Sequence, residues 1–129
     1  MTTRIITLIL ASLSVLTFGL RAEEMKNVTV SEAAKLVQEK KVTVLDVRTA
    51  GEFKDGHIEG AKNIDFTQTE SFKSALKELD KKQPYLVHCQ AGGRSGKSMK
   101  IFKELGFENI LHLEEGFGGW EDAKQPIAK

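Results

Sequence analysis

Residues 85–106 read YLVHCQAGGRSGKSMKIFKELG and contain the transition that decides the fold. The run from Tyr85 to His88 follows Pro84 and has the composition of a short buried strand. From Ser95 onward the apolar residues recur with helical spacing, and Gly106 stands where a helix commonly ends. This stretch therefore predicts a strand, a short glycine-containing loop and a helix in succession.

The rest of the chain repeats this alternation of short β-branched runs and helical patterns. Strands that alternate with helices imply right-handed crossover connections, so we predict the α/β class, with a mainly parallel sheet flanked by helices on both faces. We expect strands at residues 28–30, 41–47 and 109–113, a helix capped by Ser31, a second helix over residues 72–79, a loop-rich connection from Gly51 to Gly60 and a turn at residues 116–119.

The first 22 residues differ in composition from the rest of the chain. Arg4 precedes an uncharged run over residues 5–20, and Ala22 is a small residue ahead of a polar sequence. This pattern is typical of a secretory signal peptide, so we predict a signal peptide at residues 1–22, one domain at residues 23–129 and an exported, periplasmic protein. The alternatives are an uncleaved membrane anchor, for which the run is short, and a buried core helix, for which it lacks a polar face.

The composition excludes several classes of protein. Cys89 is the only cysteine, so an intramolecular disulfide, a Cys-x-x-Cys redox pair and a zinc site built on several cysteines are excluded. The three histidines have no metal-ligand spacing, so no metal is expected. The formal net charge of +1 becomes −1 without residues 1–22, which gives no electrostatic reason to expect a nucleic-acid partner.

The loop between the predicted strand and the predicted helix has the residues of an anion-binding site. It follows a parallel strand, where α/β proteins bind ligands, and adjacent glycines allow backbone N–H groups to turn toward an anion. An isolated cysteine is commonly a small buried hydrophobic residue, but at the start of such a loop its thiolate is stabilised. We therefore predict that Cys89 is the nucleophile and that the substrate-binding residues are Gln90, Ala91, Gly92, Gly93, Arg94 and Ser95.

The length of this loop distinguishes two anion chemistries. Tyrosine-phosphatase-type sites place five residues between the cysteine and the arginine, which suits a tetrahedral phosphate. Here four residues separate Cys89 from Arg94. This smaller ring is better suited to a single terminal sulfur atom, and Arg94 would either receive an anionic substrate or brace the loop through a carboxylate.

Two stretches resemble the rhodanese-like domain, the sulfurtransferase family. Residues 45–63, LDVRTAGEFKDGHIEGAKN, match its Asp-x-Arg, Glu-Phe, Gly-His-Ile and Gly-Ala-x-Asn pattern, and residues 89–95 match its active-site loop. The resemblance extends over about residues 27–127, and Glu115 is a departure where many members have glycine. An exported single domain of this size is similar to the phage-shock-protein-E type of rhodanese. The family implies a five-stranded, mainly parallel central sheet.

The resemblance also implies a thiosulfate-type sulfurtransferase reaction. Cys89 would take sulfane sulfur from thiosulfate or a similar small anionic donor, hold it as a persulfide and pass it to cyanide or a thiol. No metal or organic cofactor is expected. A membrane partner is expected only if the N-terminal segment is retained, and the sequence contains no indication of an oligomeric state.

The remaining motif residues are expected to support the loop rather than to react. We expect Asp46 to pair with Arg94 or to cap the loop. Arg48 and Glu52 are expected to form an ion pair that holds the connection over residues 51–60, unless they are plain surface charges. A hydrogen-bonding brace is the expected role of His57. The predicted structural motif residues are therefore Asp46, Arg48, Glu52 and His57.

The other two histidines are expected to have no direct part in the chemistry. His88 should point to the face opposite Cys89 if its strand continues, because successive side chains alternate along a strand. His112 belongs to no motif, and we expect it to be an ordinary residue of its strand.

Two other functions are consistent with the same residues. A sulfur-carrier or sensing module would hold the same persulfide on Cys89 but would show little turnover. A phosphatase or an arsenate-handling enzyme would use the same cysteine, although the four-residue spacing to Arg94 counts against it.

Overall fold

A five-stranded sheet forms the centre of this protein, whose computed structural model describes residues 24–129. The strands lie in the order β1-β6-β5-β2-β4, and every neighbouring pair is parallel. The predicted α/β class and parallel sheet are therefore confirmed. The strands of the sheet are β1 (Glu24–Val28), β2 (Thr43–Asp46), β4 (Lys62–Asn63), β5 (Tyr85–His88) and β6 (Asn109–Leu113).

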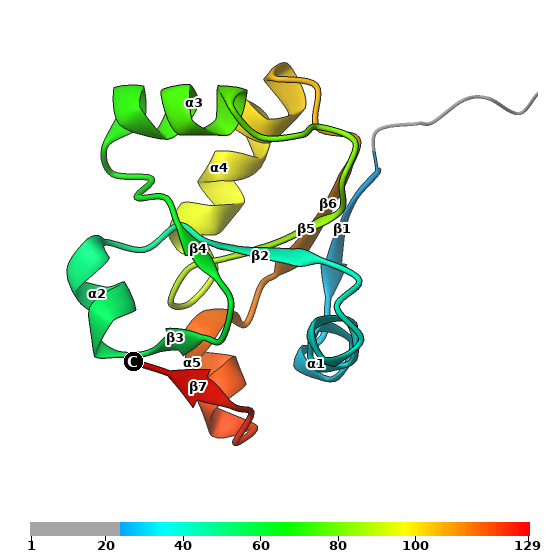
Figure 1. Cartoon of the computed structure of the whole chain (residues 1–129), viewed down its shortest axis with the longest axis vertical. Coiled ribbons are helices and arrows are strands. Elements are labelled where there is room, and N and C mark those ends of the chain that lie inside the picture. The colour runs from blue at the N-terminus through cyan, green and yellow to red at the C-terminus, as the bar shows by residue number, and fades with distance from the viewer. Residues whose placement is uncertain (1–23) are drawn as a thin grey trace, which may run out of the picture.

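Helices follow most of the strands, and a second, two-stranded sheet lies near the C-terminus (Figure 1). In this small sheet β3 (His57–Ile58) and β7 (Ile127–Ala128) are antiparallel. The helices are α1 (Val30–Gln38), α2 (Ala50–Asp55), α3 (Thr69–Lys77), α4 (Gly93–Glu104) and α5 (Gly116–Asp122).

The predicted signal peptide at residues 1–22 lies outside the described residues, as does residue 23. The export of the protein and the boundary between the two predicted segments therefore stay predictions. Within residues 24–129, no helix has both the length and the apolar character needed to cross a membrane.

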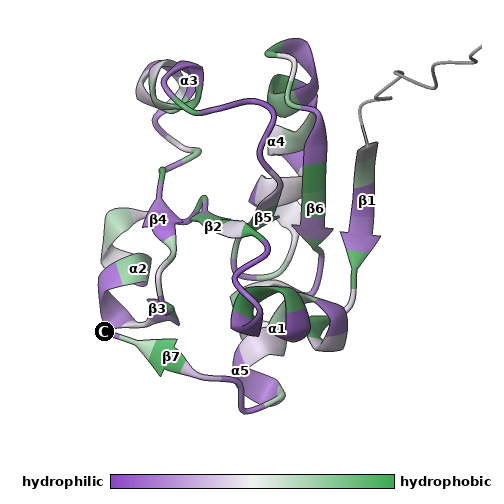
Figure 2. Ribbon diagram, turned by 45° about the vertical axis from the view of Figure 1, so that its right-hand side comes forward, coloured by the Kyte–Doolittle hydropathy of each residue, from purple (hydrophilic) through white to green (hydrophobic). Residues whose placement is uncertain are grey.

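Helices cover both faces of the central sheet, and each face has its own hydrophobic core (Figure 1). On the face covered by α3 and α4, the ring of Phe102 meets Phe72 and Phe107 edge-on, with centroid distances of 6.0 and 5.1 Å. On the face covered by α1 and α5, buried Trp120 and Ala33 belong to the second core. In Figure 2 the inner strand β6 is green along its middle, whereas β1, at the edge of the sheet, is largely purple.

The first strand and the first helix differ from the predicted boundaries. β1 begins at Glu24 and ends at Val28, because it pairs with β6 in register along its whole length. Thr29, not Ser31, caps α1: its side-chain oxygen accepts a hydrogen bond from the backbone N–H of Glu32 (3.1 Å). The predicted strand at residues 28–30 and the Ser31 cap are therefore wrong.

The predicted loop from Gly51 to Gly60 contains the short helix α2. Thr49 and Glu52 form a capping box, in which Thr49 Oγ1 accepts from the backbone N–H of Glu52 (3.3 Å) and Glu52 Oε1 accepts from that of Thr49 (3.2 Å). This reciprocal pair satisfies two N–H groups at the start of the helix, so Gly51 lies in a helix rather than in a loop.

The predicted turn at residues 116–119 is the first part of helix α5. Phe117 and Trp120 are buried in the second core, and the indole N–H of Trp120 donates to the carbonyl oxygen of Pro126 (2.9 Å). Burial of these two rings against the sheet therefore outweighs the weak helix propensity of the neighbouring glycines. Elsewhere β5 and β6 have their predicted bounds, and Gly106, with a φ of +83°, follows the end of α4 as predicted.

Candidate active site

The loop of residues 89–95, here called the cradle, connects the carboxyl end of β5 to the first turn of α4. Cys89 belongs to the core under α4 and is only 1% exposed. Its sulfur accepts hydrogen bonds from the backbone N–H of Gly92 (3.1 Å) and from the hydroxyl of Ser95 (3.3 Å). The thiol therefore lies inside the cradle and is bonded to donors that favour an anion.

These donors oppose the effect of burial on the Cys89 thiol. Burial is the largest single influence on its pKa and raises it, because a buried charge loses its hydration. The hydroxyl of Ser95 and the backbone N–H groups of Ser95, Ala91 and Gly92 lower it, and together they hold the pKa of Cys89 below the ordinary value of a thiol. The cradle is thus suited to a thiolate or to another sulfur anion at this position.

Two glycines allow the cradle to pack directly against the start of α5. Gly116 has a φ of +66°, and a Cβ there would lie 2.4 Å from the carbonyl oxygen of Gln90. Gly92 has a φ of +94°, and a Cβ there would lie 2.5 Å from the carbonyl oxygen of Glu114. The backbone N–H of Phe117 donates to the carbonyl oxygen of Cys89 (2.8 Å). The close approach made possible by glycine therefore fixes the shape of the cradle.

The charged residues around the cradle form ion pairs with partners other than those predicted. Arg94 donates to both carboxylate oxygens of Glu52, from Nη1 to Oε1 (2.6 Å) and from Nη2 to Oε2 (3.0 Å). The capping box places Glu52 on the first turn of α2, within reach of Arg94. Arg48 is buried at the end of β2 and pairs with Asp46 instead. The predicted Arg48–Glu52 and Asp46–Arg94 pairs are therefore wrong, and Arg94 acts as a brace.

The Glu52 carboxylate is strongly stabilised in its charged form. Hydrogen bonding from Arg94 is the main cause, burial acts in the opposite direction, and the backbone and side chain of Thr49 add to the effect of Arg94. Together they lower the pKa of Glu52 from 4.5 to about 2. Since Glu52 both caps α2 and holds Arg94, α2 is attached to the cradle by an ionic contact.

Arg48 is a buried hub that joins four parts of the site. Its side chain is bound to Asp46, through Nη2 to Oδ2 (2.7 Å) and Nε to Oδ1 (3.0 Å). It also donates to the carbonyl oxygen of Gly56 (2.7 Å) and to the side-chain oxygen of Gln90 (3.2 Å). The guanidinium carbon lies 4.2 Å from the centroid of the Phe117 ring. Arg48 therefore connects the end of β2, the end of α2, the cradle and α5.

Two of the histidines, His57 and His88, form hydrogen bonds beside α2 and the cradle. The ring of His57 stacks on that of Phe53 at 3.8 Å, and its Nδ1 donates to the carbonyl oxygen of Phe53 (2.8 Å), which is the arrangement of a brace. His88 is fully buried, and its Nδ1 donates to the carbonyl oxygen of Cys89 (2.9 Å). Burial is the main cause that lowers the pKa of His88, so it is a neutral core residue at pH 7.

A chain of polar side chains that was not predicted from the sequence leads away from the thiol. Ser95 Oγ lies 2.7 Å from Nε2 of His112, and Nδ1 of His112 lies 3.0 Å from the side-chain oxygen of Asn27. His112 is therefore not an ordinary residue of β6. The available signal was its place within the apolar strand of residues 109–113, because a histidine buried in such a strand must find polar partners.

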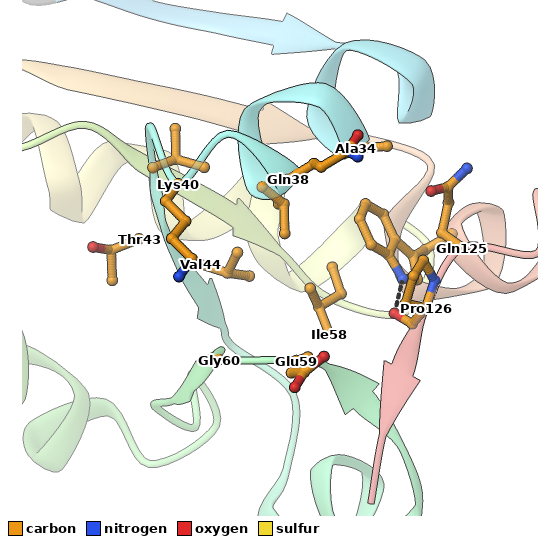
Figure 3. A pocket seen from close by; sticks show the side chains of 13 residues that line it. Ala34, Gln38, Lys40, Thr43, Val44, Ile58, Glu59, Gly60, Gln125 and Pro126 are labelled. Carbon is orange, nitrogen blue, oxygen red and sulfur yellow. Dashed lines mark hydrogen bonds between the residues drawn. The ribbon is translucent and has the colours of Figure 1, made fainter.

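A shallow cavity of about 250 Å³ opens beside the cradle, and a larger one lies elsewhere. The larger cavity, of about 720 Å³, lies between α1, β3 and Trp120 and includes no residue of the cradle (Figure 3). Among residues 24–129 no group of three His, Cys, Asp or Glu side chains is arranged to hold a metal ion. The small cavity is lined by Arg48, Glu52, Asp55, Gly56, Gln90, Phe117 and Glu121.

Comparisons with known proteins agree with this geometry. The thiosulfate sulfurtransferase GlpE of Shewanella oneidensis is 29% identical over 98 residues, which cover 76% of this chain and 94% of that protein. The uncharacterized protein YibN of Escherichia coli K12 is 26% identical over 121 residues, which cover 94% of this chain and 85% of that protein. The crystal structure of a rhodanese-related protein from Thermoplasma volcanium superposes with a TM-score of 0.71 at 26% identity, and the match covers 80% of this chain and 97% of that one.

The sequence pattern of the rhodanese-like domain matches residues 29–123, which is most of the chain. The same region contains the parallel sheet from β2 to β6, the cradle and the two glycines that shape it. The chain therefore belongs to the rhodanese-like domain family.

Proposed function

We propose that this protein is a sulfurtransferase that moves sulfane sulfur from a small anionic donor such as thiosulfate to a thiol or to cyanide. The observation that carries the proposal is the environment of Cys89: a single thiol whose sulfur accepts hydrogen bonds from Gly92 and Ser95 at the carboxyl end of a parallel strand. The similarity to a thiosulfate sulfurtransferase supports the choice of donor.

The reaction proceeds in two nucleophilic steps. The Cys89 thiolate attacks the outer sulfur of thiosulfate, the S–S bond of thiosulfate breaks, and sulfite leaves with the electron pair of that bond. The product is a persulfide on Cys89, whose terminal sulfur carries the negative charge. A thiolate or cyanide then attacks this terminal sulfur. The S–S bond of the persulfide breaks, and its electron pair regenerates the Cys89 thiolate. The first transfer leaves the sulfur in the cradle, and the second removes it.

The cradle residues have distinct parts in this scheme. The backbone N–H groups of Ala91, Gly92 and Ser95 stabilise the negative charge on sulfur in each state. Gly93 begins α4, so the positive end of this helix faces the cradle. Arg94 keeps the cradle attached to α2 through Glu52 rather than offering its guanidinium to the substrate.

Gln90 is bonded to the buried hub, Arg48, and is the cradle residue that lines the shallow cavity. Its side-chain oxygen accepts from Arg48, and its side chain lines the cavity of about 250 Å³ beside the cradle. We therefore assign Gln90 to the entry side of the site, where the donor and the acceptor arrive.

The phosphatase alternative is less well supported by the same geometry. Only four residues separate Cys89 from Arg94, and both Nη atoms of Arg94 are bonded to Glu52. A phosphatase-type site would need this guanidinium to bind the phosphoryl oxygens, since bidentate binding of an arginine to phosphate gives such sites their specificity.

The test is to incubate the wild-type protein and Cys89→Ser with thiosulfate and to measure intact mass, thiocyanate formation in the presence of cyanide, and hydrolysis of a small aryl phosphate. We expect the wild type to gain the mass of one sulfur atom and to form thiocyanate repeatedly, and Cys89→Ser to do neither. Turnover that survives in Cys89→Ser would contradict the mechanism. Sulfur loading without repeated turnover would indicate a carrier instead, and hydrolysis of the aryl phosphate would indicate a phosphatase.

The predicted export of the protein has its own test. We propose that residues 1–22 are removed on export, so that the mature protein starts at Glu23. N-terminal sequencing of the protein recovered from the periplasmic fraction should begin at this residue, whereas a protein that keeps its first residues and stays in the membrane fraction would support the anchor.

A further inference from the structure

His112 lies in a row of side chains that crosses the sheet under α4. In the register of the sheet it is paired with Val87 on β5 and with Asn27 on β1. The residue is 7% exposed, and its ring lies next to the first turn of α4, where a Cβ on Gly96 would be 3.9 Å from its Cε1 atom. The ring is therefore held between α4 and the sheet, with one nitrogen toward Ser95 and the other toward Asn27.

The carboxylate of Glu114 determines which way the hydrogen bonds of this row run. Glu114 Oε2 can only accept, so the nitrogen of the Asn27 amide donates to it (3.3 Å) and the amide oxygen is left facing His112. The Nδ1 atom of His112, 3.0 Å from this oxygen, must then carry a proton. The neutral form of His112 consequently has its lone pair on Nε2, the nitrogen that faces Ser95.

The single hydroxyl proton of Ser95 has two acceptors to choose from. It can be donated to Nε2 of neutral His112 at 2.7 Å, or to the sulfur of Cys89 at 3.3 Å. When it is donated to His112, the Ser95 oxygen is free to accept the S–H proton of Cys89. When it is donated to sulfur, Nε2 must itself be protonated in order to donate to the Ser95 oxygen. The two states differ by the movement of two protons along one hydrogen-bonded chain.

We propose that His112 is the base that takes the Cys89 proton, that Ser95 relays it, and that Asn27 and Glu114 are positioning residues that fix the tautomer of His112. In this step the S–H proton passes to the Ser95 oxygen while the Ser95 hydroxyl proton passes to Nε2, and the electron pair of the S–H bond stays on sulfur. The products are a thiolate and an imidazolium, with the Ser95 hydroxyl between them. No other bond changes and no other reactant is needed.

The groups around His112 make the protonation of its Nε2 atom sensitive to the charge on Cys89. The negative charge of Glu114 raises the pKa of His112, but burial is the larger influence and lowers it. Cys89 approaches from the end of β5, and Ser95 and the backbone of Gly96 approach from α4. His88, on the opposite face of the sheet, is neutral, and the charge of Arg94, in the first turn of α4, is paired with Glu52. A thiolate on Cys89, reached through Ser95, would add a second negative charge to that of Glu114, and both charges stabilise an imidazolium at His112.

This proposal rests on the proposed function for the use of the thiolate, but its test needs no sulfur transfer. The chain has a single cysteine, so the rate of alkylation by iodoacetamide and the thiolate absorbance near 240 nm both report on Cys89 alone. In the wild type, coupled titration of Cys89 and His112 should give two steps in the alkylation rate as the pH rises. In His112→Gln, which keeps a polar side chain but cannot be protonated, we expect one step and an alkylation rate at pH 7 that is about tenfold lower.

A double-mutant cycle separates a relay from a merely structural role. Ser95→Ala should lower the rate by a similar factor, and the double variant Ser95→Ala, His112→Gln should be no slower than Ser95→Ala alone, because the relay is already broken. Asn27 is exposed, so Asn27→Ala should fold, and it should give an intermediate loss because the tautomer is no longer fixed. Circular dichroism shows which variants are folded, and only the alkylation rates of folded variants are compared with the wild type.

The outcomes distinguish this proposal from the proposed function. An unchanged pH profile in folded His112→Gln, or in folded Asn27→Ala if the first variant does not fold, overturns the relay, whether or not the wild type forms thiocyanate. Independent, additive losses in the double variant also overturn it. A single-step profile with a coupled loss supports the relay, even if thiosulfate proves not to be a donor for the wild type.

Discussion

Replacing Glu52 with glutamine should destabilise the protein in a way that depends on pH. Glu52→Gln keeps a side chain that can complete the capping box with Thr49, but it removes the negative charge that holds Arg94. A fall in the pKa of Glu52 from 4.5 to about 2 corresponds to roughly 3 kcal/mol if it is converted directly. The Arg94 and Glu52 side chains are 30% and 33% exposed, so screening by water reduces the value, and we expect roughly 1–2 kcal/mol at pH 7.

The sign of the pH dependence follows from the lowered pKa. Above pH 4.5 the carboxylate is charged in both the folded and the unfolded protein, and its stabilising effect is fully present. As the pH falls from 4.5 toward 2, the unfolded protein takes up the proton first, so the stabilising effect is lost. The difference in the free energy of unfolding between wild type and Glu52→Gln should therefore be constant from pH 7 to about 5 and shrink below that.

Urea unfolding at a series of pH values measures this difference, and the single tryptophan, Trp120, is a buried fluorescent reporter. Glu104→Gln is the matched control, because Glu104 is an exposed carboxylate of α4 for which no ion pair occurs among the described residues. We expect this control to change stability by less than about 0.5 kcal/mol at every pH. A Glu52→Gln effect that is equally small at pH 7, or that is the same at pH 7 and pH 3, would refute the assignment of the lowered pKa to the Arg94 contact.

Two further changes test the parts that shape the cradle. Gly116→Ala should lower the free energy of unfolding by about 2 kcal/mol or more, because φ is +66° and the new methyl group would collide with the Gln90 carbonyl. Gly51→Ala in α2, where nothing lies within 4 Å, should instead be neutral or stabilise by about 0.5 kcal/mol, and a similar loss for both alanines would contradict the close approach. Asp46→Asn should cost about 3–5 kcal/mol in urea unfolding, because it leaves the buried charge of Arg48 without its partner, and a loss below about 1 kcal/mol would show that this pair is not important for stability.

The parts of the fold that could be predicted are those fixed by local sequence. β5 and β6 are apolar runs with clear boundaries, and a glycine with positive φ, Gly106, follows the end of α4, which is a local requirement. Helix α5 could not be predicted from GFGGW, because its helical state depends on the burial of Phe117 and Trp120 against the sheet. Helix α2 had a usable signal, since Thr49 and Glu52 have the spacing of a capping box, but the glycines around it favoured a loop.

The ion-pair and hydrogen-bond partners of the site residues were harder to predict than the site residues themselves. The motif residues near the cradle include two acidic and two basic side chains. Which of them form ion pairs depends on the direction in which each side chain points from its helix or strand, and this direction is set by the tertiary structure. Asp46 and Arg48 stay together at the buried end of β2, whereas Glu52 reaches Arg94 from the exposed side of the site. His112 and Asn27 are 85 residues apart in sequence, and only the register of β1 on β6 brings them together.

The arrangement of charge in the site bears on what the cradle can hold. Arg48 is bonded to Asp46 and Arg94 to Glu52, so neither arginine contributes an uncompensated positive charge to the cradle. The sulfur of Cys89 is instead stabilised by neutral donors, the N–H of Gly92 and the hydroxyl of Ser95. Neutral dipoles at short range favour a single negative charge on a sulfur atom inside the cradle, whereas a phosphoryl group with two charges held at the same place needs a cation close by. The ion pairs that brace the cradle therefore also favour a singly charged sulfur anion at Cys89 over a doubly charged phosphoryl group inside the cradle.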